Sequence, residues 1–575
     1  MKRYGLILFG IIFAVLVACS QPAMQAGPAK TNVQTSERAS DTAGDFTAPA
    51  WGQRFMEHIR TLASDDFEGR APATKGETLT TEYVINQFKQ MGLAPGNPDG
   101  SYVQKVPLIG YTSLPQATFN ASGVAAPLKF PQDFVAWSAT QQAEIAIDNN
   151  DMLFVGYGTI APEYGWDDYK GADVKGKTIV MLINDPPLPD PTDPSKLDAK
   201  MFKGDAMTYY GRWTYKFEMA AKLGAAAAII IHETKPAAYP YSVVMNSWSR
   251  ENFSINDGPN KNFPPIPAWI HLDRAKDLFH ASGLDFDLMK KSALSKDFKP
   301  VLLKSKNQMK VKNTWRTVES NNVLAKIEGS DPTLKNEYVI YTAHWDHFGM
   351  DEKLAGAKTQ KIYHGALDNA SGVAALLELA RAFKQLPVAP KRTIIFLATT
   401  AEEQGLLGAQ YYANHPLYSL QKTLANINMD GMNMWGRTSD VEILGFGNST
   451  LEDVLNDAAK KQNRSVNPES RAELGGYFRS DHFEFAKVGV PALYMKSRTQ
   501  YIGQPADYAK QKVDNYIAND YHKVTDVIHD DWNPSGAMED MALLFDVGMR
   551  VSQAANFPQW KPESEFRARR EQMLK

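Results

Sequence analysis

The chain has 575 residues, of which 43% are hydrophobic and 22% charged, an ordinary composition for a globular protein with a large core. A formal net charge of −3, with no basic run and no zinc-finger spacing, gives no reason to expect nucleic acid as a partner. The length predicts roughly two to four domains.

The N-terminus predicts export. Two basic residues precede an apolar run, residues 6–18, which is shorter than the roughly 20 residues of a spanning helix. The run ends in Leu-Val-Ala-Cys, which resembles a bacterial lipobox with Cys19 as the lipidated residue; an unlipidated signal peptide is the alternative. Cys19 is the only cysteine, which excludes disulfides and argues against thiol catalysis. We therefore expect a lipoprotein signal peptide at 1–19 and a flexible tether at 20–46.

The same features predict where the protein works. A lipid on Cys19 would anchor the chain to a membrane. Ser20 follows it, in place of the aspartate associated with inner-membrane retention, so we expect an outer-membrane lipoprotein facing the periplasm. A periplasmic or secreted protein, released after signal cleavage, is the alternative.

The next segment predicts two helices. Apolar residues recur at helical spacing at Phe55, Ile59 and Leu62, and again between residues 83 and 91. A polar loop, "LASDDFEGRAPATKGE", separates the two runs.

The pattern of apolar and turn-forming residues changes at about residue 133 and stays different to about residue 314. Short strand-like runs alternate with Gly, Pro and Asp, which favours a small β-rich domain with a few helices. Within it, "FEMAAKLGAAAAIIIHE" predicts a helix leading into a buried strand at 225–231.

From about residue 322 onwards, strands alternate with helices. "EYVIYTAHW", "RTIIFLATT", "LANINMD" and "VGVPALYM" are apolar runs of strand length, and residues 371–386 form an amphipathic helix between the first two. This alternation predicts an α/β fold with a mostly parallel sheet flanked by helices. Ligands in such sheets bind beyond the carboxyl ends of the strands, so the chemistry is expected there.

Polar residues do gather at these predicted strand ends. Each has an ordinary explanation when taken singly: Asp368 could cap the following helix, and His344 could be a hydrogen-bonded core histidine. Together they would be desolvated charges without partners, which is costly. The residues concerned are His344, Asp346, Asp368, Glu402, Glu403 and Asp430, with Tyr521 and His522 further along the chain.

A pair of divalent metal ions would provide these desolvated charges with partners. Imidazole and carboxylate together suit zinc or a similar first-row ion. A two-metal site needs one bridging carboxylate and further ligands on each ion, and one Asp, two His and two acids supply them. One glutamate is then left over. We predict that Glu403 coordinates, whereas Glu402 stays beside the metals as the general base.

These motifs resemble those of the M28 zinc aminopeptidases over residues 323–556. "AHWDHFG", "GALDNASG", "TTAEEQGLLGA", "NMDGMN" and "YHKVTD" occur in the order of that family. The resemblance implies a phosphorylase/hydrolase-like mixed α/β fold with two Zn²⁺ per chain, Co²⁺ or Mn²⁺ being possible substitutes. It also implies a catalytic domain at 315–575, with its N-terminal part at 47–132.

The resemblance also implies the role of each ligand. His344 and Asp430 would bind one metal, and Glu403 and His522 the other. Asp368 would bridge the two ions.

Other residues receive supporting roles. The resemblance aligns Glu402 with the general base, and Asp346 with an acid that orients the first histidine ligand through its second nitrogen. We assign Asp481 and His482 to the pocket wall or to the support of the ligands, although His482 is tempting as a ligand itself. Tyr521 could stabilise an oxyanion or simply pack. Three further histidines are expected to be structural or surface residues: His347, His364 and His415.

Residues 133–314 resemble a protease-associated (PA) domain, inserted between the two parts of the catalytic domain. The helix and strand at 217–233 carry most of this resemblance. In relatives this module roofs the active-site cleft. A passive interaction domain is the alternative.

The sequence therefore predicts an exported zinc-dependent exopeptidase, an aminopeptidase that releases N-terminal residues from peptides. A carboxypeptidase, a dipeptidase and a glutaminyl-peptide cyclase are alternatives with the same core. A receptor-like binding protein, as the transferrin receptor is, would have lost metal ligands, whereas all five are present here. Arg479 and the loop 497–519 are candidates for the substrate pocket, and the sequence predicts no oligomeric state.

Overall fold

The computed structural model describes residues 44–121, 123–258, 262–496 and 499–575. The predicted signal peptide, Cys19 and nearly all of the predicted tether lie outside these ranges, so they remain predictions. Within the described ranges, no helix combines the length and the apolar character that a membrane crossing requires.

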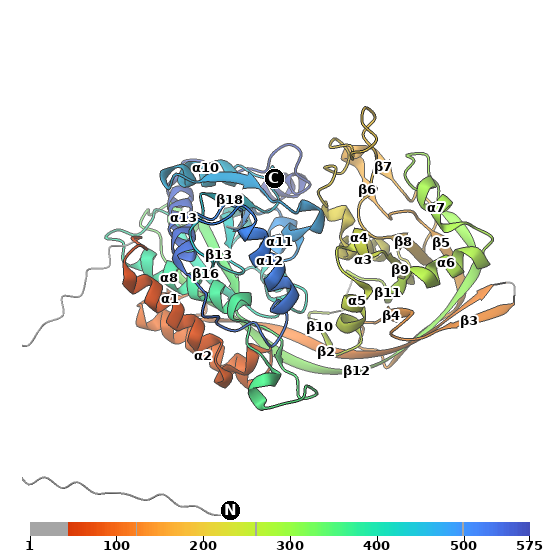
Figure 1. Cartoon of the computed structure of the whole chain (residues 1–575), viewed down its shortest axis with the longest axis horizontal. Coiled ribbons are helices and arrows are strands. Elements are labelled where there is room, and N and C mark those ends of the chain that lie inside the picture. Colours follow the sequence, from red (N-terminus) through yellow and green to blue (C-terminus); the bar gives the residue numbers. More distant parts are fainter. Residues whose placement is uncertain (1–43, 122, 259–261, 497–498) are drawn as a thin grey trace, which may run out of the picture. The chain divides into compact units, whose positions relative to one another are not determined.

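The two helices expected near the N-terminus are confirmed as α1 (Pro49–Leu62) and α2 (Lys75–Gln90). α1 buries Phe55, Ile59 and Leu62, which share one face at helical spacing. This face packs against α8 (Ser371–Lys384), the helix predicted between the first two strands of the C-terminal half. The N-terminal helices and the C-terminal half therefore share one core (Figure 1).

Four parallel strands carry the predicted site, and all four coincide with apolar runs expected to be strands. They lie in the order β20, β17, β13, β16. Tyr338 pairs with Thr393, and His344 with Thr399, so the carboxyl ends of β13 and β16 meet at one edge. Their bounds are β13 (Tyr338–His344), β16 (Thr393–Thr399), β17 (Thr423–Asn428) and β20 (Ala492–Lys496).

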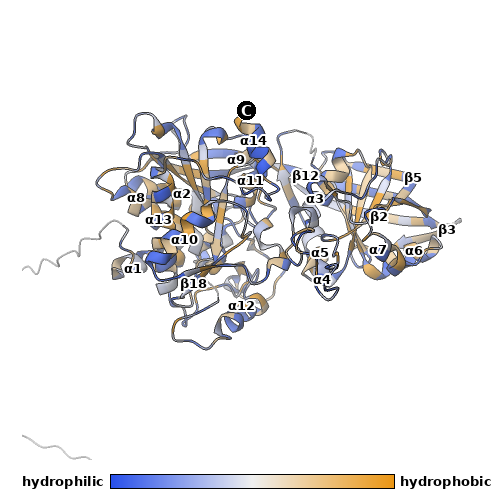
Figure 2. Ribbon diagram, turned by 90° about the horizontal axis from the view of Figure 1, so that it is seen from above, coloured by the Kyte–Doolittle hydropathy of each residue, from blue (hydrophilic) through white to orange (hydrophobic). Residues whose placement is uncertain are grey.

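Successive strand residues face opposite layers of helices. Val339 and Tyr341 pack in a core shared with α1, α8, α10 and α13, whereas Ile340 between them packs with residues of α9 and α11. A sheet buried on both faces explains why these strands read as continuous apolar runs. Hydrophobic residues are accordingly concentrated in the strands and on the inner helix faces (Figure 2). The remaining elements around this sheet are α9 (Leu407–Asn414), β18 (Asp440–Ile443), α10 (Leu451–Lys461), β19 (Ser465–Pro468), α11 (His482–Lys487), α12 (Tyr508–Asn519), α13 (Ser535–Gln553) and α14 (Arg567–Leu574).

The inserted segment contains a second run of parallel strands, in the order β5, β8, β9, β11, which belongs to the same continuous 16-stranded sheet. The predicted helix and strand are confirmed as α3 (Trp213–Lys222) and β9 (Ala227–His232), although the strand begins two residues later than expected. Hydrophobic cores lie on both faces of this sheet. The other elements are β4 (Phe134–Ala136), β5 (Glu144–Phe154), β8 (Thr178–Leu182), α5 (Tyr241–Trp248), β10 (Asn252–Ile255), β11 (Ile266–His271), α6 (Leu272–Ala281) and α7 (Phe286–Ser292).

Two long antiparallel strands connect the two parallel regions of the sheet. β2 (Val103–Ala121) pairs along its whole length with β12 (Val301–Ile327). β12 also pairs with β16 at one end and with β5 at the other, so it joins the two regions into one sheet (Figure 1). The predicted domain boundary at 314/315 falls inside this unbroken strand.

Candidate metal centre

The predicted ligands converge at the carboxyl edge of the four-stranded sheet. His344 is the last residue of β13, and Glu403 and Asp430 lie shortly beyond the ends of β16 and β17. Asp368 lies in a short helical turn just before α8, and His522 follows α12. Because the strands are parallel, one edge of the sheet collects side chains from distant parts of the chain.

One carboxylate stands between the two histidines. Oδ1 of Asp368 lies 3.3 Å from Nε2 of His344, and its Oδ2 lies 3.3 Å from Nε2 of His522. Each imidazole also faces a second acid. Asp430 Oδ1 is 3.6 Å from His344 Nε2, and Glu403 Oε2 is 3.3 Å from His522 Nε2. The five residues thus form two ligand groups that share Asp368.

These separations fit a pair of metal ions. Ligand atoms at about 2.0–2.2 Å from a tetrahedral zinc lie about 3.3–3.6 Å apart. The observed nitrogen–oxygen separations are 3.3, 3.3, 3.3 and 3.6 Å. His344 Nε2 is buried and has no hydrogen-bond partner among the described residues, as expected of a nitrogen that offers its lone pair to a metal.

The charges around the site also require cations. Seven carboxyl groups lie within this region, with few protein cations to balance them. Buried charges are costly unless they are paired or coordinate metals. The acids are Asp346, Asp368, Asp481 and Asp526, which are at most 7% exposed, Glu402, which is 9% exposed, and Glu403 and Asp430, with side chains 4% and 16% exposed.

Glu402 lies at the margin of the first ligand group. Its Oε2 is 3.9 Å from His344 Nε2, farther than the corresponding oxygens of Asp368 and Asp430. Burial raises the pKa of Glu402 well above its ordinary value; the nearby His344 opposes this shift, and Glu403 adds to it. A carboxylate that is basic, close to the ligands and not the nearest of them suits the predicted general base.

Asp346 supports the ligands in a different way from that predicted. Nδ1 of His344 lies 3.1 Å from the main-chain carbonyl oxygen of Asp346, whereas the carboxylate Oδ1 is 3.8 Å away, too far for a hydrogen bond. The carboxylate instead accepts the backbone N–H groups of Glu402 and Glu403, at 3.0 and 3.3 Å. Asp346 thus orients the histidine through its carbonyl and holds the Glu402–Glu403 loop through its side chain.

The structure places the other predicted residues around the ligands. Asp481 is buried and accepts a hydrogen bond from the hydroxyl of Thr399. His482 is buried near the rings of Tyr477 and Tyr494, at 4.6 and 4.7 Å between ring centroids, and burial lowers its pKa to about 3. Both are fully buried and neither lines the large cavity described below, so they support the site from behind rather than form the pocket wall. Ring stacking at 3.8 Å joins Tyr521 to His522.

His347 was expected to be structural or on the surface, and it lies buried directly beside a predicted ligand. It is fully buried, and its Nδ1 lies 2.5 Å from Oε1 of Glu403. Burial lowers the pKa of His347 to about 4, so the neutral ring can donate to Glu403. This contact leaves Glu403 Oε2 directed at His522. The repeated histidine in "HWDH" was the only sequence signal for it.

Arg70 is a second residue that the sequence did not reveal. It is 1% exposed and donates to four carbonyl oxygens, those of Leu62, Trp345, His364 and Gly365, at 2.6–2.9 Å. Burial lowers its pKa to about 10, against the opposing pull of nearby acids. Arg70 therefore braces the loops that carry the ligands and contributes a fixed positive charge.

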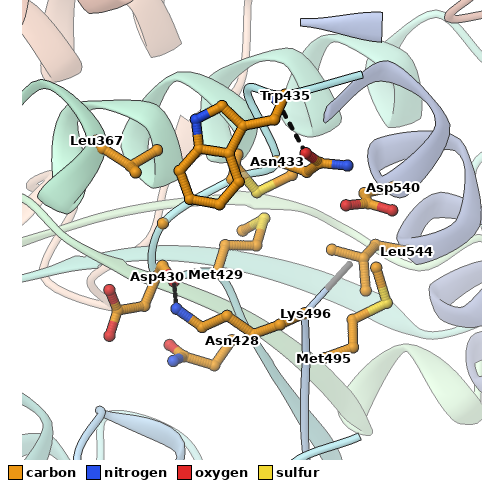
Figure 3. Close-up of a pocket in the computed structure, with 12 residues that line it drawn as sticks. Leu367, Asn428, Met429, Asp430, Asn433, Trp435, Met495, Lys496, Asp540 and Leu544 are labelled. Atoms are coloured by element: carbon orange, nitrogen blue, oxygen red, sulfur yellow. Dashed lines mark hydrogen bonds between the residues drawn. The ribbon is translucent and has the colours of Figure 1, made fainter. Parts of the chain in front are cut away.

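Asp526 and Lys496 bind the main chain at two of the predicted ligands, Asp368 and Asp430. The Asp526 carboxylate accepts the backbone N–H groups of Leu367 and Asp368, both at 3.0 Å. Lys496 Nζ donates to the carbonyl oxygen of Asp430, beside a cavity of about 20 Å³ (Figure 3). A cavity of this size has room for about one water.

A much larger cavity, of about 860 Å³, opens onto the ligands. It lies within the roughly 300–1,000 Å³ typical of ligand sites. Glu402, Glu403 and His522 line one part of it, while Arg212 and Trp248 of the inserted segment line another. The cavity therefore joins the candidate metal centre to the insert.

Comparison with known proteins finds a family match in the part of the chain that carries the predicted ligands. Residues 322–545 match the family described as peptidase family M28. "Aminopeptidase NAALADL1" from Mus musculus is 31% identical over 196 residues, which are 31% of this chain and 24% of that protein. "Probable zinc metalloprotease" from Pyrenophora teres f. teres is 38% identical over 113 residues, 20% of this chain and 23% of that protein. The chain thus spans about a quarter of the length of these curated relatives.

Two solved structures are similar over most of the chain. An aminopeptidase from Aneurinibacillus sp. strain AM-1 is 18% identical, with a TM-score of 0.46 over 88% of this chain and 95% of that one. BSAP, described as a zinc aminopeptidase from Bacillus subtilis, is 16% identical, with a TM-score of 0.41 over 90% of this chain and 97% of that one.

Proposed function

We propose that the protein is a zinc-dependent aminopeptidase, starting from the match of residues 322–545 to peptidase family M28. The observation that carries the proposal is the Asp368 carboxylate between two imidazoles, with a second acid facing each of them. A carboxylate shared in this way is what a two-metal hydrolytic site requires. The relatives described as an aminopeptidase and a probable zinc metalloprotease support the same function.

Two Zn²⁺ ions per chain are the proposed cofactors, with Co²⁺ or Mn²⁺ as substitutes. His344, Asp430 and Asp368 would hold one ion, and His522, Glu403 and Asp368 the other. Bound ions of this kind acidify a water molecule and polarise the carbonyl of the scissile bond.

The chain's own residues then provide proton transfer and positioning. A carboxylate oxygen of Glu402 takes a proton from the attacking water and returns it to the leaving amine. The raised pKa of Glu402, caused by burial, brings it towards the range in which a carboxylate can both accept and release a proton. The surplus of buried acids also favours a cationic group in the cavity, which suits the free N-terminal amine of a peptide.

We also propose that residues 133–314 are a PA domain that closes one side of the cavity. Arg212, Trp213 and Trp248 support this, because they belong to the insert and line the same cavity as Glu402. The anchoring of the chain is proposed from the sequence alone, as a lipid on Cys19 at the outer membrane facing the periplasm. Labelling with radioactive palmitate should mark the intact protein and spare Cys19→Ala.

The experiment that tests the function compares four substrates on purified protein of known metal content. These are an aminoacyl arylamide, its N-acetylated form, an N-terminal glutaminyl peptide, and a peptide blocked at its N-terminus with a free C-terminus. Cleavage of the first alone, lost on chelation and restored by Zn²⁺, is the expected result. Ring closure of the glutaminyl peptide would indicate a cyclase, and cleavage of the last a carboxypeptidase. Metal-free protein without turnover would favour a binding protein.

A further inference from the structure

Both oxygens of the Glu403 carboxylate are engaged. Oε2 lies 3.3 Å from Nε2 of His522, the histidine proposed to share its ion, whereas Oε1 lies 2.5 Å from Nδ1 of His347. A carboxylate that binds a metal is ionised and can only accept hydrogen bonds, so the hydrogen between Glu403 and His347 belongs to Nδ1. The N–H of His347 therefore occupies Oε1 and leaves Oε2 for an ion.

The packing around His347 fixes the direction of this N–H. His347 is fully buried, and a Cβ atom at Gly365 would lie 2.7 Å from its ring. Gly365 has a left-handed backbone, with φ at 55°, and its carbonyl oxygen accepts a hydrogen bond from Arg70 at 2.9 Å. The backbone N–H of His347 in turn donates to the carbonyl oxygen of Arg70 at 3.3 Å. Arg70 and Gly365 thus hold the ring of His347 in one orientation.

The two proposed ion sites differ in how firmly their histidines are held. The side chain of His344 is 0% exposed, and its Nδ1 lies 3.1 Å from the carbonyl oxygen of Asp346. The side chain of His522 is 35% exposed, and the preceding helix α12 buries only Ala509. The site at His522 therefore relies more heavily on Glu403 and on the residue that orients Glu403.

We infer that His347 is a positioning residue for the ion between Glu403 and His522, and that only this ion depends on it. The inference rests on the two-metal centre of the proposed function. Without the N–H of His347, the Glu403 carboxylate is free to rotate, and the ion loses a ligand oxygen that is held in place. The ion between His344 and Asp430 should be spared, because the carbonyl oxygen of Asp346 positions His344 independently.

Three substitutions at position 347 place an N–H donor differently. His347→Asn carries an amide N–H at the position of Nδ1, His347→Gln carries it at the position of Nε2, and His347→Leu carries none. Metal-free protein is titrated with Zn²⁺ against a chromophoric chelator, which reports a dissociation constant for each ion. This measurement requires no turnover.

We expect the unaltered protein to bind two ions per chain. In His347→Leu and His347→Gln, the affinity for one ion should fall about 10–100-fold, the usual range when a residue that orients a metal ligand is removed. The other ion should bind as before. His347→Asn should recover most of the lost affinity, because its N–H can still reach Oε1 of Glu403.

Cobalt provides a second signal, and a neighbouring histidine provides the control. The absorption produced by the first equivalent of Co²⁺ should be the same in His347→Leu as in the unaltered protein, and that of the second should be weaker. His364→Leu is the control, because His364 is also buried and adjoins Gly365, but its Nε2 lies 2.8 Å from Asp65 rather than from a proposed ligand. This variant should bind both ions normally.

The outcomes separate this inference from the proposed function. Unchanged affinity for both ions in His347→Leu and His347→Gln would overturn the inference and leave the proposed aminopeptidase intact. An equal loss of both ions would also overturn it, since His347 would then support the loops in general. Unaltered protein that binds no metal would overturn the proposed function itself, and the inference with it.

Discussion

The 16-stranded sheet has two parallel regions whose strands end in polar side chains, and only one of these edges gathers unbalanced carboxyl groups. In the insert, Asp185 follows β8 and accepts hydrogen bonds from the amide and the hydroxyl of Thr208, both at 2.7 Å. His232 ends β9, and its Nε2 lies 3.1 Å from the carbonyl oxygen of Tyr239. Both of these polar groups therefore have a partner within the insert.

A buried lysine completes the balance in the insert. Lys216 is fully buried and donates to the carbonyl oxygens of Tyr157 and Asn184. Its charge lowers the pKa values of Asp168 and Asp185, against the larger effect of burial. At the carboxyl edge of β13, β16, β17 and β20, by contrast, seven carboxyl groups face few cations among the described residues, Arg70 and Lys496 being two of them. Polar residues at strand ends are therefore a weak sign of function, whereas unbalanced buried charge at those ends is a strong one.

The largest effect is expected when the predicted general base is replaced by an amide. The same change at a buried acid of the insert is its control. Glu402→Gln is expected to lower kcat on an aminoacyl arylamide by about 10²–10⁴-fold, since an amide cannot accept the proton. Elemental analysis should find its metal content unchanged. Asp168→Asn, an equally buried change in the insert, should keep nearly full turnover. Near-normal turnover in Glu402→Gln would remove it as the base.

Removing the balancing lysine should affect stability rather than chemistry. Lys216→Met leaves two carbonyl groups unpaired and the buried acids uncompensated, so we expect a loss of about 3 kcal/mol in the free energy of unfolding. Lys310→Met is the control: Lys310 is exposed and pairs with Glu144 at 2.7 Å, where pairs contribute less than about 1 kcal/mol. Urea unfolding measures both. Equal midpoints for the two variants would contradict the role given to Lys216.

Metal affinity should depend on the acid that holds the Glu402–Glu403 loop. Asp346→Asn keeps one of the two carboxylate acceptors, and we expect metal affinity to fall about 10–100-fold. Asp331→Asn offers a matched change, because Asp331 accepts two backbone N–H groups at 2.9 Å in an exposed turn. Competition with a chromophoric chelator measures the dissociation constants. Unchanged affinity in Asp346→Asn would mean that the loop holds its shape unaided.

The smallest effect concerns His482, a fully buried histidine at the start of α11. Because burial lowers the pKa of His482 to about 3, the folded state keeps the ring neutral where the unfolded chain takes up a proton. As pH falls from about 6.5, the free energy of unfolding should decrease by up to about 1.4 kcal/mol per pH unit on this account.

His482→Phe should flatten this dependence, measured by denaturant unfolding of metal-free protein between pH 6.5 and 4.5. His271→Phe, at an exposed position of the insert, should retain the wild-type slope. A slope that is unaffected by His482→Phe would assign the pH dependence to other groups.

Much of the fold and of the site could be predicted because both depend on local sequence patterns. Strands β13, β16, β17 and β20 and helix α8 were predicted from runs of apolar residues at fixed spacing. The parallel order of strands then brings His344 and Asp430 to one edge, whereas the choice of His522 over His482 as a ligand came from the family resemblance. The path of β12 through a predicted boundary was not expected, because pairing with both parallel regions of the sheet leaves no break in composition.

The supporting residues could not be predicted because their partners are distant in sequence. Arg70 looked like part of a polar loop, and only the folded chain brings it to carbonyl groups 275–295 residues away. Asp346 has a partner in its own motif, yet the split of roles between its carbonyl and its carboxylate depends on backbone geometry.

Arg70 has a consequence for anyone who wishes to isolate the chemistry of this chain. The matched segment, residues 322–545, begins long after Arg70, so a truncated protein starting there would lose its clamp on three loop carbonyls. Such a fragment would retain every proposed ligand and still fail to assemble the pocket. The smallest protein that keeps the proposed site must therefore include the segment from α1 to α2, which carries Arg70.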